Sequence, residues 1–224
     1  MAHLEPSDHI KNTHLKSLLD VVFEQSQKEL KHMRSQLDSD SQELAKKERE
    51  FMFKECAKLE NIGKLQSKLD AYREANSSMT PAQRAKECLA TDNSEKLGNH
   101  LRAIGQFRCG FRWQAHHIVC SRHGSHAAAR FILLAYMLIN DPFNGCWLPQ
   151  KHKYAQGTPY PNAVGHVYLH TNDYAQWVTR EIRPANNLSD LIRRLQGIRL
   201  KLIDARNLPD ILTAKGKQDL RTIR

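Results

Sequence analysis

The sequence predicts an α+β protein that is mostly helical, with an N-terminal helical hairpin or bundle and a second half that mixes short strands with helices. Residues 9–72 contain no proline and only one glycine, and they are rich in strong helix formers. Strand-type segments first occur after residue 106, where capping and turn residues separate them from further helical stretches. A small sheet inside a largely helical second half is therefore expected.

Residues 1–75 are expected to form a helical hairpin or short coiled coil that is accessory to the rest of the chain. The acidic segment 38–41 predicts a break between two helices, and the region contains no catalytic constellation. An alternative hypothesis makes this region the main function of the protein, as an adaptor or oligomerisation element. The hairpin prediction depends on apolar side chains that recur at every seventh position, namely Phe23, Leu30, Leu37, Leu44 and Phe51.

Residues 76–105 are expected to form linking helices. Thr80 is a favourable N-cap residue, and Pro81 fits the first position of a helix because its missing N–H is not needed there. A second helix is expected to begin at Asp92 or Asn93 and to end at Gly105.

The expected strands lie in the first part of the region 106–224. The composition of residues 107–111 and 114–120 predicts a β-hairpin. Ser125 is expected to cap a buried helix that runs to residue 139. The turn Asn144-Gly145 then leads into a short strand at residues 146–148.

Helices are expected in the remainder of the chain. Residues 165–182 have helical composition up to Pro184, which ends the pattern. Asn187 or Ser189 is expected to cap a further helix that ends near residue 204.

The positive charge of the protein is concentrated in its second half. The chain carries a formal net charge of +10, made up of −1 in residues 1–100 and +11 in residues 101–224. Seven of the twelve histidines lie between residues 116 and 170. A positive field attracts nucleic acid and neutral imidazoles bind divalent metals, although a solvated basic surface with incidental histidines would have the same composition.

We expect neither a membrane span nor a signal peptide in this sequence. Its longest apolar run, residues 127–139, has 13 residues and includes Arg130, whereas a span needs roughly 20. We therefore expect no membrane partner and export, if any, by a route other than the general secretory one. Five cysteines without a CxxC motif indicate a reducing compartment. Three of them, Cys109, Cys120 and Cys146, are expected to be small buried hydrophobes or extra zinc ligands.

Four histidines of the second half form a pattern with chemical content. His166 and His170 are four residues apart in a segment expected to be helical, so one face of the helix presents both to a single metal ion. His116 and His117 are neighbours on an expected strand, where adjacent side chains point to opposite faces. One histidine of this doublet can therefore bind metal while the other meets a substrate, and phosphodiester hydrolysis requires both roles.

The motifs around these residues resemble those of a known family. Gln-Ala-His-His-Ile-Val at 114–119, Asn-Gly-Cys-Trp-Leu-Pro at 144–149 and Gly-His-Val-Tyr-Leu-His-Thr-Asn-Asp-Tyr at 165–174 occur in that order. With them, residues 114–178 resemble the AHH family of the HNH/endonuclease VII superfamily, the His-Me finger nucleases. The resemblance implies a ββα-metal nuclease core with additional helices in residues 106–224. It also implies a role as a toxin module of bacterial polymorphic toxin systems, including effectors of type VI secretion.

The resemblance assigns roles to individual residues of this chain. It implies that His117 is the general base that activates water, that His116 is a metal ligand, and that His166 and His170 complete the metal site. Asn144 would take the middle Asn position, where it orients the loop of the base or buttresses the finger. The sequence departs from the simplest pattern of the superfamily because a whole expected helix separates the His doublet from Asn144.

Basic residues that flank these motifs are candidates for binding the phosphates of a substrate, although a solvated basic rim is the alternative for each one. His152 is either a further phosphate contact or ligand, or a surface histidine in a basic loop. The candidate substrate-binding residues are Arg112, Arg122, Lys151, His152 and Lys153.

The leading functional hypothesis is a metal-dependent DNA endonuclease with low sequence specificity that acts as an antibacterial toxin. Its expected cofactor is one divalent ion, Mg²⁺ first, with Mn²⁺, Ni²⁺ or Zn²⁺ as substitutes. Its expected partners are DNA, a cognate immunity protein with an acidic surface, and a delivery component that binds the N-terminal helices. We expect synthesis in a bacterial cytoplasm and delivery into target cells. The alternatives are a ribonuclease on the same scaffold and a non-catalytic, metal-stabilised nucleic-acid-binding module.

Overall fold

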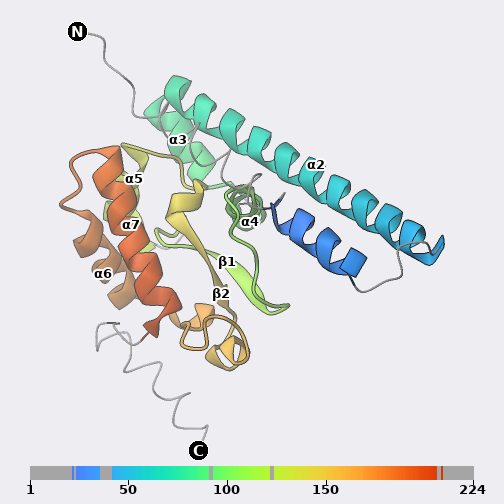
Figure 1. The fold of residues 1–224 in the computed structure, drawn as a ribbon. Coiled ribbons are helices and arrows are strands. Elements are labelled where there is room, and N and C mark those ends of the chain that lie inside the picture. Colours follow the sequence, from blue (N-terminus) through green and yellow to red (C-terminus); the bar gives the residue numbers. More distant parts are fainter. Residues whose placement is uncertain are drawn as a thin grey trace, which may run out of the picture.

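A computed structural model describes residues 22, 24–35, 42–90, 93–121, 124–205 and 208 (Figure 1). These residues form helices around one small antiparallel sheet, which confirms the predicted mostly helical α+β class. Across the described ranges, no helix has both the length and the apolar character that crossing a membrane requires.

The N-terminal part contains a long helix that runs along one side of the molecule (Figure 1). This helix, α2 (Gln42–Ser78), lies antiparallel to a helical segment at residues 24–35, and the pairs Ser26–Glu55 and Arg34–Glu48 join the two. Leu30 and Leu44 are buried, as the seven-residue pattern predicts. The expected break at residues 38–41 lies outside the described residues, as do Phe23 and Leu37.

The two predicted linking helices are present, and the predicted cap of the first is confirmed. Thr80 is the N-cap of α3 (Pro81–Cys88) and forms a capping box with Gln83. Helix α4 (Asn93–Ala103) follows, and Gly105 adopts a left-handed conformation with φ 79° just after its end.

The sheet consists of β1 (Trp113–His117) and β2 (Gly145–Pro149), which pair antiparallel with Ala115 opposite Trp147. The prediction of a hairpin between residues 107–111 and 114–120 was wrong, because the partner of β1 comes from a segment 30 residues away in the chain. Phe111 is 86% exposed, so the apolar residues before β1 do not face a core as strand residues would.

Two expected helices are shorter in the structure than the sequence predicted. Helix α5 (Ala127–Leu134) follows the 3₁₀ turn η1 (Gly124–His126) and ends before the predicted residue 139, where the Ile139 carbonyl accepts a hydrogen bond from the Asn144 side chain instead of one within a helix. Helix α6 (Asn172–Ile182) begins later than the predicted residue 165, because Thr171 is its N-cap. Residues 166–168 form the 3₁₀ turn η4 (His166–Tyr168).

The remaining elements complete the second half. They are the 3₁₀ turns η2 (Pro142–Asn144) and η3 (His152–Ala155), and the helix α7 (Leu188–Ile203), whose predicted N-cap Asn187 is confirmed.

The two faces of the sheet lie in two different hydrophobic clusters. Trp113, Ala115 and Trp147 pack with Leu97 and Leu101 of α4. The opposite face contributes residues of β2 to a larger cluster with α5, α6 and α7, including Cys146, Leu148, Leu133, Tyr174 and Leu195. Helix α4 approaches β2 closely, since a Cβ on Gly145 would lie 2.6 Å from a Leu97 methyl carbon. Consecutive side chains of β1 therefore enter environments built from different parts of the chain.

The C-terminal end of α2 is attached to the loop that precedes β2. Arg73 donates two hydrogen bonds to the carboxylate of Asp141, from Nε at 2.9 Å and from Nη2 at 3.3 Å. Its guanidinium carbon also lies 5.3 Å from the centre of the Phe143 ring. This bidentate contact connects the long N-terminal helix to the region that carries the His doublet.

Replacing Arg73 by Ala should lower the free energy of unfolding by about 2 kcal/mol, because the Asp141 carboxylate loses its ion-pair partner while it stays buried. Urea unfolding followed by circular dichroism measures the change. Lys64→Ala is the matched control, since Lys64 pairs with Glu60 on the exposed face of the same helix. Equal stabilities of the two variants would show that the Arg73–Asp141 pair does not hold the helix to the loop.

Candidate active site

Three histidines from two parts of the chain meet on one face of β1. The ring of His116 lies 4.9 Å from the ring of His166 and 6.2 Å from that of His170, measured between centroids. His166 is in η4 and His170 precedes α6, so the predicted HxxxH α-helix was wrong. The 3₁₀ turn nevertheless brings the two rings together, with 3.1 Å between the Nε2 atoms of His166 and His170.

The hydrogen-bond partners of His116 and His166 determine which ring nitrogen is free. Tyr174 donates its hydroxyl proton to the Ile118 carbonyl at 3.1 Å, so at 2.9 Å its oxygen accepts from Nε2–H of His116, and Nδ1 of His116 keeps its lone pair. His166 donates Nδ1–H to Oε1 of Gln114 at 2.8 Å and keeps a lone pair on Nε2. Metal-binding histidines usually donate their second ring N–H to a protein acceptor in this way.

The His cluster provides part of a donor set for a metal ion. No group of three His, Cys, Asp or Glu side chains in the described ranges is arranged to hold one. Two imidazole nitrogens that share an ion at about 2.1 Å would lie about 3.0–3.4 Å apart, and the Nε2 atoms of His166 and His170 have this separation. His116 is close to both but contacts Tyr174 through its other nitrogen. The pair fits as ligands, and His116 is the nearest candidate for a third.

Burial keeps most of these imidazoles neutral. It lowers the pKa of His166 to about 4, with a further contribution from the neighbouring His170. Burial and the nearby histidines also place the pKa of His116 well below its ordinary value. His170 differs, since a hydrogen bond to Cys120 raises its pKa. Neutral imidazole is the form that binds a metal or accepts a proton.

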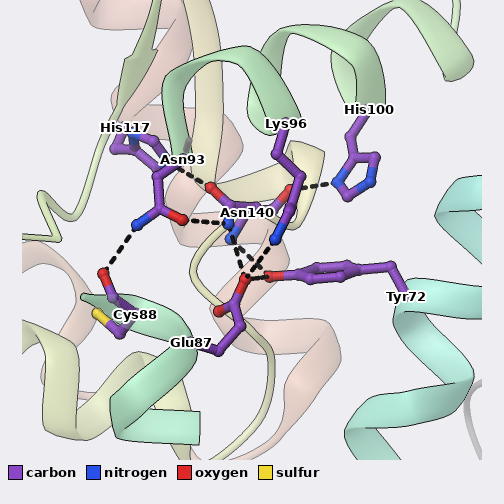
Figure 2. Close-up of polar contacts among 8 residues, drawn as sticks. All are labelled: Tyr72, Glu87, Cys88, Asn93, Lys96, His100, His117 and Asn140. Carbon is purple, nitrogen blue, oxygen red and sulfur yellow. Dashed lines mark hydrogen bonds and ion pairs between the residues drawn. The ribbon is translucent and has the colours of Figure 1, made fainter. Parts of the chain in front are cut away.

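His117 points to the opposite face of β1, toward α4. It is 8% exposed, and its Nε2 lies 2.8 Å from Oδ1 of Asn140 (Figure 2). Burial lowers its pKa to about 4 despite the opposing effect of this hydrogen bond. A charge on His117 would also lower the pKa of His116 and of His166, so the three rings are close enough to interact.

Asn144 connects the loop after β1 to the loop before β2. Its Nδ2 donates to the carbonyls of Val119 and Ile139 at 3.2 and 2.9 Å, and its Oδ1 accepts from Val119 N–H at 2.9 Å. Its own carbonyl accepts from Ile118 N–H at 2.9 Å. Asn144 is completely buried, and these contacts fix the loop that follows the His doublet.

The candidate phosphate-binding residues are partly assembled beside η4. Arg112 and Lys153 lie over the ring of Tyr154 at 5.1 and 5.3 Å, and Lys151 is exposed at the start of η3. Val167 N–H donates to the Gln150 carbonyl, which places this basic loop next to the turn that carries His166. The last two candidates are placed differently: His152 donates Nδ1–H to the Ala163 carbonyl at 3.0 Å, and Arg122 lies outside the described residues.

All five cysteines lie in described parts of the chain and form no disulfide. Cys146 is buried in the core, which raises the pKa of its thiol to about 12. Cys120 is half-buried and forms a hydrogen bond with His170, so it contacts the His cluster directly.

The geometry agrees with a comparison of the sequence with known protein families. Residues 97–202, a little less than half of the chain, match the model of the AHH family, a nuclease family of the HNH/ENDO VII superfamily with conserved AHH. This part of the chain is similar to the AHH nucleases. The AHH segment includes Ala115-His116-His117, both strands and helices α6 and α7. Searches of curated proteins and of solved structures found no match.

Three residues of the AHH site were missed in the sequence. Gln114 precedes His116 by two positions, and strand alternation alone would have placed it on the same face. The hydroxyl contact of Tyr174 with His116 has no signal in the spacing of the sequence. Asn140 precedes Asp-Pro, a common turn signal, which indicates the end of a helix but no contact with His117.

The metal-free protein should lose stability in mild acid. His100, His116 and His117 are buried with a lowered pKa, so the folded protein keeps them neutral while the unfolded chain takes up protons below its pKa of about 6.5. Their contribution is therefore present above that pH and is lost as the pH falls toward the folded pKa, about 4 for His117.

With EDTA present, urea unfolding at pH 7.5 and 5.5 should differ by about 1 kcal/mol for each such histidine. His100→Gln should reduce the pH dependence, since it removes one of the three groups. Equal or greater stability at pH 5.5 would contradict the neutral, buried state of these histidines.

Proposed function

We propose that this nuclease is a metal-dependent endonuclease that hydrolyses DNA. The observation that carries the proposal is the pairing of two sites on one strand: a cluster of neutral imidazoles around His116 and a separate, hydrogen-bonded His117 within the same AHH motif. A purely structural metal site has no need of the second imidazole. This difference favours catalysis over a non-catalytic nucleic-acid-binding module.

His166 and His170 would hold the ion through Nε2, and His116 is the nearest candidate for a third ligand, through Nδ1. A divalent ion bound there supplies charge that polarises the phosphate and stabilises the leaving oxygen. An all-imidazole donor set suits Zn²⁺ and Ni²⁺, whereas Mg²⁺ and Mn²⁺ prefer oxygen ligands and would take more of them from water and phosphate.

His117 would act as the general base. Its Nε2–H is committed to Asn140, so Nδ1 is the nitrogen that accepts a proton from the attacking water. The water oxygen forms a bond to phosphorus while the bond from phosphorus to the 3′ oxygen breaks. A lowered pKa keeps His117 in the unprotonated form that this step requires.

The basic loop beside η4 would bind the substrate. Arg112, Lys151 and Lys153 carry positive charge next to the turn that holds His166. Contacts of this kind recognise the phosphate backbone without reading bases, so binding should weaken steeply with added salt. RNA presents the same phosphates and is the alternative substrate.

Cleavage of supercoiled plasmid by the full chain tests the proposal. EDTA should abolish nicking, and added Mg²⁺, Mn²⁺, Ni²⁺ or Zn²⁺ should restore it to different degrees. His117→Ala should reduce turnover roughly 10²–10⁴-fold, whereas His32→Ala, on the exposed N-terminal helix, should not. Full activity in EDTA, or in His117→Ala, would refute the mechanism. Preferential cleavage of an RNA substrate would reassign the substrate to RNA.

The biological role that we propose is that of an antibacterial toxin delivered by a type VI or related secretion system. The protein would be made in the bacterial cytoplasm, with the N-terminal helices as the attachment site for delivery. A nuclease without base-reading contacts endangers the cell that makes it. An immunity protein with an acidic surface would capture the +11 second half rapidly and block it.

Expression of the chain alone in a bacterial cytosol tests the toxin role. Wild type should arrest growth and fragment the chromosome, and His117→Ala should do neither at the same protein level. Equal growth of the two strains, with intact chromosomes, would contradict the toxin role even if plasmid cleavage occurs in vitro.

A further inference from the structure

Asn140 lies between the N-terminal helices and His117, and all of its hydrogen-bonding groups are engaged (Figure 2). It is completely buried, and its backbone and its side-chain amide both form hydrogen bonds. Its N–H donates to the Tyr72 hydroxyl at 3.0 Å, and its carbonyl accepts from Nδ1–H of His100 at 2.8 Å. The backbone of Asn140 is thereby fixed by α2 and by α4.

The orientation of the Asn140 amide follows from a backbone carbonyl. The Cys88 carbonyl can only accept, so at 2.8 Å it receives a hydrogen bond from Nδ2 of Asn93. Oδ1 of Asn93 must then accept, and it does so from Nδ2 of Asn140 at 2.8 Å. The second proton of Nδ2 goes to Oε1 of Glu87, also at 2.8 Å. The Asn140 amide cannot flip without losing both bonds.

The same chain of bonds determines the tautomer of His117. Because Nδ2 of Asn140 is held by two acceptors, Oδ1 is the atom that faces His117, and a carbonyl oxygen can only accept. His117 therefore carries its proton on Nε2, and its lone pair is on Nδ1. A residue that hydrogen-bonds to a functional imidazole fixes its tautomer and its orientation. Removing such a residue typically lowers activity about 10- to 100-fold.

We propose that Asn140 is the positioning residue of His117, and that helices α2, α3 and α4 hold it in place. The proposal rests on the function of His117 proposed above. Glu87 closes the arrangement because its Oε1 accepts from both Asn140 and the Tyr72 hydroxyl, with Lys96 at 3.7 Å. Tyr72, Glu87, Asn93 and Lys96 all precede residue 97, where the family match begins. The proposed general base, His117, is thus held in part by residues that lie outside the segment matching the family.

Asn144 does not perform this task. Its side-chain contacts are with backbone groups of Val119 and Ile139, and they fix the loop after β1 rather than the imidazole. The two asparagines therefore have separate roles, one toward the loop and one toward the His117 ring.

Imidazole NMR of the ¹⁵N-histidine-labelled full chain tests the proposal without relying on activity. Wild type at neutral pH should show the His117 ring, assigned with His117→Gln, protonated on Nε2 and unprotonated on Nδ1, with Nε2–H protected from solvent exchange. Asn140→Leu, which keeps the size but removes the amide, should lose that protected proton. Its kcat on plasmid should fall 10- to 100-fold, with little change in KM or in metal affinity.

Arg73→Ala is the matched control, because it perturbs Asp141 of the same loop but leaves the chain from Cys88 to His117 intact. It should keep the protected Nε2–H and a kcat near that of wild type. Asn93→Ala is the second variant if Asn140→Leu does not fold. It keeps Asn140 but removes one of the two acceptors of its amide. The Nε2–H of His117 should then exchange with solvent faster than in wild type.

Three outcomes would overturn the proposal: a protected Nε2–H in Asn140→Leu, a wild-type kcat in that variant, or an equal loss of kcat in Arg73→Ala. A wild-type protein that cleaves no nucleic acid would refute the proposed function instead, and the tautomer measured by NMR would still decide whether Asn140 holds His117.

Discussion

The antiparallel pairing of β1 with β2 is the constraint on which the rest of the site depends. Side chains alternate along a strand, so the register that places His116 opposite Cys146 also places His117 on the other face, opposite Gly145. One face joins the cluster around α6 and α7, and the other packs on α4. Two adjacent histidines thereby acquire different surroundings and can take different chemical roles.

The loop that precedes β2 carries three buried polar side chains within five residues. Asn140 bonds to the His117 ring, Asp141 receives Arg73 from α2, and Asn144 holds the loop that follows β1. Each of these side chains is buried and hydrogen-bonded, and removing one partner of such a contact costs more than the contact contributes net. The N-terminal helices consequently contact the loop that carries Asn140, the residue hydrogen-bonded to His117.

The local elements of this fold could be predicted because their signals lie within a few residues. Thr80-Pro81 and Asn187 start helices, Gly105 ends one, and Asn144-Gly145 leads into β2, all as the sequence indicates. The long-range features could not be predicted in this way. The partner of β1 lies beyond an intervening helix, and a hairpin with the nearer apolar segment was the simpler interpretation.

The candidate site shows the same limit. The sequence identifies His116, His117, His166 and His170, but the expected α-helix around the last two is a 3₁₀ turn that ends where Thr171 caps α6. Spacing alone could not show this, because an i,i+4 pair is compatible with either conformation. Asn140 could not be identified at all, since its function depends on residues from three helices up to 68 positions away. The division of the chain at residues 75 and 105 stays a prediction.

The central claim is that the two neighbours on β1 have different tasks, and metal titration measures this most directly. Isothermal titration calorimetry of the full chain with Ni²⁺ or Zn²⁺ would compare His116→Ala with His117→Ala, and no substrate is needed. We expect His116→Ala to lose metal affinity at least tenfold and His117→Ala to bind as wild type does. Equal losses in the two variants, or a loss confined to His117→Ala, would contradict the account.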